Sequence, residues 1–211
     1  MGTEPADPRR HAPATLRNRA PILTVLRRVL PTSGMLLEIA SGTGEHAAWM
    51  APQLAPGLAW QPSDAEAAAL PGIDAHGRAA GAATVRPAIL LDAAAAEWPL
   101  EAADAIFCCN LAHIAPWAAT LGLLAGAARL LPPKGPLVLY GPFRRHGLHT
   151  ASSNAAFDAS LQAQNPAWRI RCVESELIPA AAAHGLALDE VVELPANNLA
   201  LVWRRQDLSA A

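Results

Sequence analysis

The stretch Met35-Leu36-Leu37-Glu38-Ile39-Ala40-Ser41-Gly42-Thr43-Gly44-Glu45-His46 decides the fold that we predict for this chain. Residues 35–39 form an apolar run broken only by Glu38, which is typical of a buried parallel strand. The small residues 40–44 then form a turn in which a ligand can lie directly against the backbone. Apolar residues at helical spacing follow from Ala47 to Leu54. The stretch therefore predicts a strand, a ligand-binding turn and a helix N-terminus with free N–H groups.

Working outward, apolar segments alternate with helical ones along the chain. We expect strands at 35–39, 58–62, 85–91, 105–109 and 137–140, with 105–109 central because it is apolar throughout. This alternation predicts an α/β fold with a doubly wound, Rossmann-like, mostly parallel sheet and helices on both faces. Residues 186–194 and 199–203 read as a hairpin, so the sheet should end with an antiparallel strand.

The predicted domain organisation is simple. Residues 1–14 are polar and proline-bearing and are expected to be a disordered lead. Residues 15–211 form one domain, whose first helix has Pro21 in its first turn. Segment 141–172 does not fit the alternation, and we predict an insertion or lid over the acceptor side, with a helix near 154–164 capped by Ser152 or Ser153.

Composition excludes several classes of protein. Of the 211 residues, 52% are hydrophobic and 16% are charged, which indicates a globular chain. The net charge of −2 argues against nucleic acid as a partner. The three cysteines lack a C-x-x-C spacing, so we expect neither a disulfide framework nor a zinc site, and a cytoplasmic location. No apolar run approaches the roughly 20 residues that span a bilayer, so no membrane partner is predicted.

Polar residues follow the predicted strands at their carboxyl ends, where ligands bind in such sheets. They are Asp64, Asp92, Asn110 and Tyr140. Asp64 lies 20 residues beyond Gly44, the spacing at which a carboxylate reaches ribose hydroxyls. The alternative role for Asp64 is a helix N-cap.

Two ligand classes suit this layout. Residues 42–47 fit the G-x-G-x-x-A pattern of a dinucleotide site, which would make the protein an NAD(P)-dependent oxidoreductase. Glu38 before the turn opposes phosphate charge but suits the cationic methionine part of S-adenosylmethionine. Asp92 adds an acceptor for an adenine amino group. The alternative for Glu38 is a buried salt bridge to Arg17 or Arg19.

Residues 38–44 resemble the E-x-G-x-G-x-G motif of class I S-adenosylmethionine-dependent methyltransferases, with Ala40 in place of the first glycine. More specifically, the chain is similar to the methyltransferase-like protein 26 family, itself filed among domains of unknown function. The blocks that carry this similarity are 17–23, 60–64, 113–117, 140–143, 153–158 and 195–199. The resemblance implies the methyltransferase fold and S-adenosylmethionine as cofactor, but no particular substrate.

The resemblance also implies roles for individual residues. Glu38, Gly42 and Gly44 would contact the methionine part, Asp64 the ribose and Asp92 the adenine side. The remaining residues of the expected cofactor set are Asn18, Arg19, Ala40, His46 and Asn110, of which Asn18 and Arg19 would close over the cofactor and Arg19 would bind the methionine carboxylate.

The acceptor side is expected to hold a small molecule. A base is required only if the acceptor loses a proton, and His113 is the first candidate, with helix capping as the alternative. Tyr140 would orient the acceptor or belong to the core. The other candidates are an aromatic wall of Trp117 and Phe143, which core packing explains equally well, and the loop amides Asn154, Asn197 and Asn198, which also favour turns.

Segment 141–172 is rich in basic side chains, namely Arg144, Arg145, His146, His149, Arg169 and Arg171. They would favour an anionic acceptor or form a solvated surface. His146 and His149 lack a third ligand at fixed spacing, so no metal site is predicted. Because Ala40 replaces a glycine and no base is obvious, a non-catalytic S-adenosylmethionine-binding module is a further alternative.

Overall fold

A computed structural model describes residues 7–207 and contains a seven-stranded sheet in the order β3-β2-β1-β4-β5-β9-β8. The first five of these strands run parallel, and β9 is antiparallel to both β5 and β8. The prediction of a mostly parallel, doubly wound sheet with an antiparallel strand is therefore confirmed. The strands of this sheet are β1 (Ser33–Ile39), β2 (Gly57–Asp64), β3 (Ile89–Leu90), β4 (Ala105–Cys109), β5 (Pro136–Gly141), β8 (Leu186–Leu194) and β9 (Asn198–Arg205).

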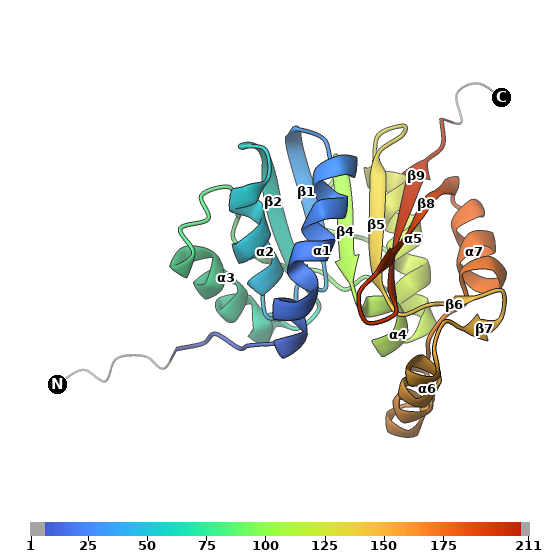
Figure 1. Ribbon diagram of the computed structural model, residues 1–211. Coiled ribbons are helices and arrows are strands. Elements are labelled where there is room, and N and C mark those ends of the chain that lie inside the picture. Colours follow the sequence, from blue (N-terminus) through green and yellow to red (C-terminus); the bar gives the residue numbers. More distant parts are fainter. Residues whose placement is uncertain (1–6, 208–211) are drawn as a thin grey trace.

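Helices cover both faces of the sheet (Figure 1). They are α1 (Pro13–Val29), α2 (Glu45–Met50), α3 (Leu70–Ala79), α4 (Leu111–Ile114), α5 (Trp117–Leu130), α6 (Ser152–Gln164) and α7 (Ile178–Ala182), with 3₁₀ turns η1 (Ala51–Gln53) and η2 (Ala67–Ala69) and a π-helical turn η3 (Val173–Leu177).

Two hydrophobic cores lie on opposite faces of the sheet, and β4 shows why. Its residues alternate between the cores: Phe107 packs with α1 and α2, whereas Ile106 and Cys108 pack with α5 and α7. A strand buried on both faces has to be apolar throughout, as 105–109 is. The central strands are thus fixed between two layers, and their carboxyl ends form one rigid edge.

The third strand and the first helix differ from the predictions. The predicted strand 85–91 shortens to Ile89–Leu90, with an isolated bridge from Val85 to Trp60, because Pro87 cannot donate to a β ladder. The first helix begins at Pro13, not near Pro21, which lies inside α1. Apolar burial of the surrounding turns outweighs the single hydrogen bond that Pro21 cannot make.

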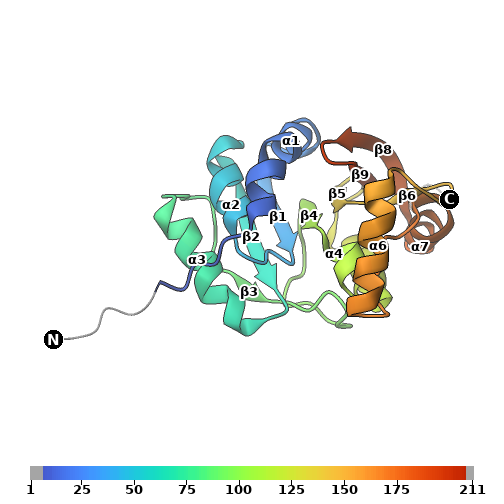
Figure 2. The same ribbon diagram turned by 60° about the horizontal axis from the view of Figure 1, so that its bottom comes forward.

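The predicted disordered lead, 1–14, falls partly outside the described residues. Residues 9–12, which are described, contact α2 and α3 through hydrogen bonds of Arg10, His11 and Ala12. Figure 2 shows this segment passing beside α3 toward the start of α1.

Segment 141–172 contains a small hairpin, β6 (Arg144–Arg145) with β7 (Leu148–His149), and then α6. Figure 1 shows α6 beyond the lower edge of the sheet, where the parallel strands end. The N-cap of α6 is Ala151 without a side-chain cap, so the predicted serine cap is wrong. None of the described helices combines the length and the apolar character that a membrane span requires.

Candidate functional site

The turn after β1 has three residues in the left-handed region: Ala40 (φ 57°), Gly42 (φ 60°) and Gly44 (φ 81°). The two glycines serve different purposes. A Cβ on Gly44 would lie 2.7 Å from Ile73 Cα, so Gly44 permits α2 and α3 to pack together. A Cβ on Gly42 would meet nothing within 4 Å, which leaves its backbone open to an adjoining cavity.

Ala40→Gly should raise the free energy of unfolding by about 1 kcal/mol, because an alanine at positive φ carries a steric strain that glycine lacks. Urea denaturation followed by circular dichroism measures this. Gly81→Ala is the matched control in the opposite direction, because Gly81 has φ 60° and open space around its Cβ position. Equal stability of Ala40→Gly and wild type would show that the turn is not strained.

Glu38 is buried behind the turn, with 1% of its surface exposed. Its Oε2 accepts hydrogen bonds from the Ser41 hydroxyl (2.8 Å) and the Trp60 indole (3.0 Å). Among residues 7–207 it forms no ion pair, so the alternative of a salt bridge to Arg17 or Arg19 is wrong. Burial raises the pKa of Glu38 to about 7, against the two hydrogen bonds. Glu38 thus stabilises the turn through its hydrogen bond with Ser41.

Asp64 clamps the turn from the neighbouring strand. Its Oδ2 accepts from the Gly42 N–H (2.8 Å), and its Oδ1 accepts from the Glu66 N–H (3.0 Å). The N–H groups of Ser41, Gly44 and Glu45 are also bound to protein oxygens. A ligand at this turn would therefore meet the Asp64 carboxylate, and not free N–H groups of these residues.

A cavity of about 780 Å³ adjoins this turn at the carboxyl ends of the strands. It is lined by the predicted residues Ala40, Gly42, Asp64 and Asp92, and its apolar walls come from 91, 93, 111 and 118–119. Asp92 holds its own turn, because its Oδ1 accepts from the Ala94 N–H at 2.8 Å. Such a volume suits a small organic ligand or cofactor.

A second cavity of about 550 Å³ lies on the other side of the segment after β4. Side chains of α1, α4, α6 and the β8–β9 turn line it. They include seven predicted residues, namely Asn18, Asn110, His113, Tyr140, Asn154, Asn197 and Asn198, together with Arg17 and Phe157, which we did not predict.

Residues 109–114 separate the two cavities. Cys109 and Leu111 line the first, Asn110 and His113 line the second, and Ile114 lines both. Asn110 adopts φ 64°, which asparagine tolerates better than most residues, and its N–H donates to the Tyr140 carbonyl at 2.8 Å. This sharp turn starts α4, and residues of one short segment therefore line both cavities.

His113 is 4% exposed, and its Nδ1 has no hydrogen-bond partner within the described part of the chain. Burial lowers the pKa of His113 to about 4, although the charge of Asp158 opposes this. The ring is therefore neutral at physiological pH. It packs edge-on against Phe157, with centroids 5.7 Å apart. Gly141 lets the ring approach β5, because a Cβ there would lie 3.3 Å from Nδ1.

A buried polar chain crosses the floor of the second cavity. His46 Nε2 lies 2.9 Å from Asn18 Oδ1, and Asn18 is also hydrogen-bonded to the Tyr140 hydroxyl. Burial lowers the pKa of His46 to about 4 and raises that of Tyr140 to about 12. All three side chains are therefore uncharged near pH 7. His46, expected at the cofactor, instead holds Asn18, which lines the second cavity together with Tyr140.

Six predicted residues line neither the first nor the second cavity: Glu38, Gly44 and His46, described above, and Arg19, Trp117 and Phe143. The Arg19 guanidinium lies over the Trp49 ring, 4.5 Å from its centroid. Trp117 packs against the core under Arg171, and Phe143 is buried in the core, so the predicted aromatic wall is wrong. The aromatic lining comes instead from Phe157 and Trp168, one on α6 and the other just beyond it. No strand-end rule marks residues of an inserted helix, which is why both were missed.

The basic side chains of segment 141–172 are neutralised by carboxylates of η3. Arg144 and Arg169 both pair with Glu176, at 3.0 and 2.7 Å, and Arg145 pairs with Glu174 at 2.6 Å. The buried Arg171 donates to the carbonyls of 112, 115 and 167. These arginines therefore hold the segment in place. They do not line the second cavity. Of the arginine and lysine residues that the structure describes, Arg17 alone lines it.

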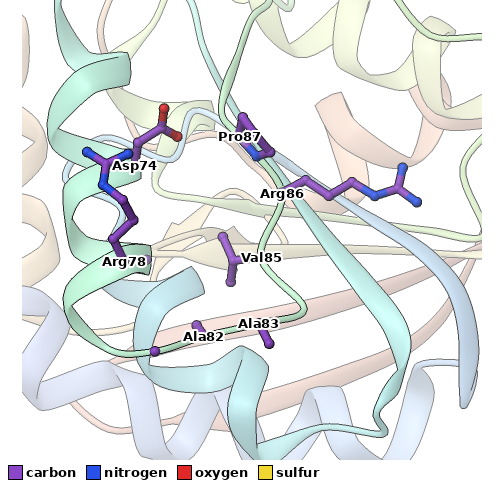
Figure 3. A pocket seen from close by; sticks show the side chains of 9 residues that line it. Asp74, Arg78, Ala82, Ala83, Val85, Arg86 and Pro87 are labelled. Carbon is purple, nitrogen blue, oxygen red and sulfur yellow. The ribbon is translucent and has the colours of Figure 1, made fainter.

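A third cavity, of about 470 Å³, lies at the β3 edge of the sheet (Figure 3). Asp74 and Arg78 of α3 lie on one side of it and Pro87 on the other, while the Arg86 side chain extends away from α3. Asp74 Oδ1 accepts from the Ala88 N–H at 2.7 Å. This cavity shares no lining residue with the other two and contains none of the predicted site residues.

The model of the family described as "Protein of unknown function (DUF938)" matches residues 9–205. This chain belongs to the DUF938 family. The match spans the residues that line both cavities and the segment 141–172.

The fold of this DUF938 protein is that of methyltransferases of known structure. CalO1, a methyltransferase in calicheamicin biosynthesis solved with S-adenosylhomocysteine (SAH) bound, has 21% identity and a TM-score of 0.69, over 88% of this chain and 53% of its own. An O-methyltransferase family protein from Burkholderia thailandensis has 18% identity and a TM-score of 0.74, over 93% and 58%. The chain thus spans little more than half of either protein. YcgJ from Bacillus subtilis has 14% identity and a TM-score of 0.69, over 90% and 98%.

Proposed function

We propose that this protein transfers the methyl group of S-adenosylmethionine to a small-molecule acceptor. The observation that carries the proposal is the pair of cavities on either side of residues 109–114. One is lined by the glycine turn and three acidic side chains, Asp64, Glu66 and Asp92, and the other by a neutral histidine and several amides. Methyl transfer requires the donor and acceptor atoms to approach within about 3–3.5 Å, so the two ligands have to meet where the cavities adjoin, at Ile114, which lines both.

The first cavity fits S-adenosylmethionine better than a dinucleotide. A pyrophosphate needs free N–H groups at the turn, but those of Ser41, Gly42 and Gly44 are bound to protein oxygens. The Asp64 carboxylate at Gly42 would repel phosphate, whereas it can accept from ribose hydroxyls. Asp92 would face the adenine side. The bound N–H groups and the Asp64 carboxylate argue against the alternative of an NAD(P)-dependent oxidoreductase.

When bound, S-adenosylmethionine supplies an electrophilic methyl group on a sulfonium sulfur. The chain itself positions the acceptor in the second cavity through Tyr140, Asn154 and the amides of the β8–β9 turn. Neutral His113 accepts the proton that the acceptor loses as it gains the methyl group. Phe157 and α6 cover the cavity and limit water, which is the lid role that we propose for segment 141–172.

The acceptor class follows from the lining of the second cavity. Its polar groups are mostly neutral amides, and Arg17 is the single positive side chain that we would assign to an anionic group. We propose a small polar acceptor, a cytoplasmic location, and kinship of this DUF938 chain with the methyltransferase-like protein 26 family.

Calorimetric titration tests the cofactor, and Gly42→Ala makes the test specific. Wild type should bind SAH and not NADH. Gly42→Ala should bind SAH at least about 10-fold more weakly, because its Cβ enters the cavity. Gly81→Ala has nearly the same φ and the same open surroundings, so it should lose similar stability and keep wild-type affinity. Binding of NADH instead of SAH would exclude the proposal.

Turnover is tested separately by incubating the protein with methyl-labelled S-adenosylmethionine and a metabolite extract. Label should appear in a low-molecular-weight product. SAH binding without any labelled product across extracts would favour the non-catalytic module.

A further inference from the structure

Three side chains that are far apart in the sequence meet outside both proposed ligand sites, next to Arg10, which lines the first cavity. They are His11 before α1, Glu45 at the start of α2 and His76 in α3. One ring nitrogen of each histidine and one carboxylate oxygen of Glu45 all lie within 4.8 Å of one another. His11 Nδ1 is 3.0 Å from Glu45 Oε1. Neither the proposed cofactor nor the proposed acceptor uses this cluster.

Hydrogen bonds hold two of these three side chains in place. Glu45 Oε2 accepts from the Ala12 N–H (2.8 Å) and the Thr43 hydroxyl (2.9 Å), which leaves Oε1 directed to His11. His76 Nε2 lies 2.8 Å from the Arg10 carbonyl, which can only accept, so Nε2 carries the proton and Nδ1 has the lone pair in the neutral ring. A ring N–H bound to a backbone carbonyl is the usual outer-shell partner of a metal-ligating histidine.

The charge state of Glu45 also suits a cation. Burial acts to raise its pKa, but hydrogen bonds from Ala12, His11 and Thr43 outweigh burial and hold the pKa below its ordinary value. Glu45 is therefore ionised at neutral pH. The exposed His11, with 70% of its side chain accessible, is free to adjust. Tetrahedral zinc ligands lie about 3.4 Å apart, so ligand atoms that now lie within 4.8 Å of one another would close up by at most about 1.4 Å on binding.

We propose that His11, Glu45 and His76 bind one divalent transition-metal ion of the zinc class, with a water completing the coordination. Two imidazoles and one carboxylate favour zinc over magnesium or calcium, which prefer oxygen ligands throughout. This inference is independent of the methyl-transfer reaction.

The consequence of such a site is structural. Arg10, next to His11, lines the first cavity, and Pro8 packs so closely on α3 that a Cβ on Gly72 would lie 2.7 Å from the Pro8 carbonyl oxygen. A metal ion would join segment 8–12 to α2 and α3, and would thereby hold Arg10 in the lining of that cavity.

The test uses the full chain, treated with a chelator, dialysed, and titrated with Zn²⁺ alone. Wild type should bind one equivalent. His76→Gln and Glu45→Gln should each bind at least about 100-fold more weakly, since loss even of an outer-shell partner costs 10–100-fold. Glu45→Gln keeps an oxygen for Ala12 and Thr43, so it should remain folded by circular dichroism. His184→Gln, an exposed histidine outside the cluster, is the matched control and should bind as wild type does.

Trypsin provides a second, conformational readout. Zn²⁺ should slow cleavage after Arg10 in wild type and His184→Gln, but not in His76→Gln. No Zn²⁺ binding by wild type, or wild-type affinity in His76→Gln and Glu45→Gln, would overturn the proposal and show that the cluster is held by hydrogen bonds alone.

Discussion

Replacing Asp64 with alanine should weaken SAH binding by at least about 100-fold, because each hydrogen bond to a charged group contributes about 1.5–3 kcal/mol and two ribose hydroxyls would lose theirs. The loss should be larger than that because the same carboxylate holds the Gly42 N–H at 2.8 Å. Calorimetric titration of SAH measures the change. Asp64→Asn, which keeps one acceptor oxygen but no charge, should lose about 10-fold.

Asp74→Ala is the matched control for this prediction. Asp74 also accepts from a backbone N–H beside a strand of the same sheet, at 2.7 Å, but lines the separate cavity at the β3 edge. Its variant should lose comparable stability and bind SAH as tightly as wild type. If Asp64→Ala binds SAH normally while remaining folded, then the first cavity is not the cofactor site.

The sheet was predictable from the sequence because buried strands carry a local signal. Residues 105–109 are apolar throughout, since both cores press on β4, and the prediction matches Ala105–Cys109 without error. The ends of elements depend on less local causes. Pro21 reads as a helix start, yet α1 runs through it because packing on the sheet stabilises the helix on both sides.

The site was predictable as far as it lies at strand ends. Asp64, Asp92 and Asn110 are placed by the fold alone, and each lines a cavity. The failures concern long-range pairings that no local pattern contains. Arg19 stacks on the Trp49 ring, and Arg144 and Arg145 form ion pairs with carboxylates about 30 residues away in the sequence. The basic side chains of this stretch therefore stabilise segment 141–172 through ion pairs.

Neutrality distinguishes the acceptor side from the cofactor side. His46, His113 and Tyr140 are kept uncharged by burial, whereas Asp64 and Asp92 line the other cavity as carboxylates. The proposed cofactor side would attract a cation, and the proposed acceptor side presents neutral hydrogen-bonding groups together with the single positive charge of Arg17. This difference would direct the two ligands to opposite sides of residues 109–114.

His113→Gln should lower the rate of labelled methyl incorporation by about 100-fold or more, because glutamine fills similar space but cannot accept a proton. Affinity for SAH should stay within about 2-fold of wild type, since His113 lines the second cavity and not the first. His149→Gln is the matched control. His149 is another histidine of this region whose Nδ1 has no partner among residues 7–207, but it pairs with Asp158 and lines neither cavity.

The pH profile of the wild type checks the same role by an independent measurement. Because the pKa of His113 is lowered to about 4, its ring is already neutral at pH 5.5, and further increases in pH add no base. We therefore expect kcat/KM to stay level between about pH 5.5 and 8, without the rise near 6.5 that a histidine of ordinary pKa would give.

Such a weak base can still take the proton of a methylated hydroxyl, which is strongly acidic, but not that of a methylated amine. A rise centred near pH 6.5 that disappears in His113→Gln would show that the ring titrates normally. A level profile together with wild-type turnover in His113→Gln would remove His113 from the reaction.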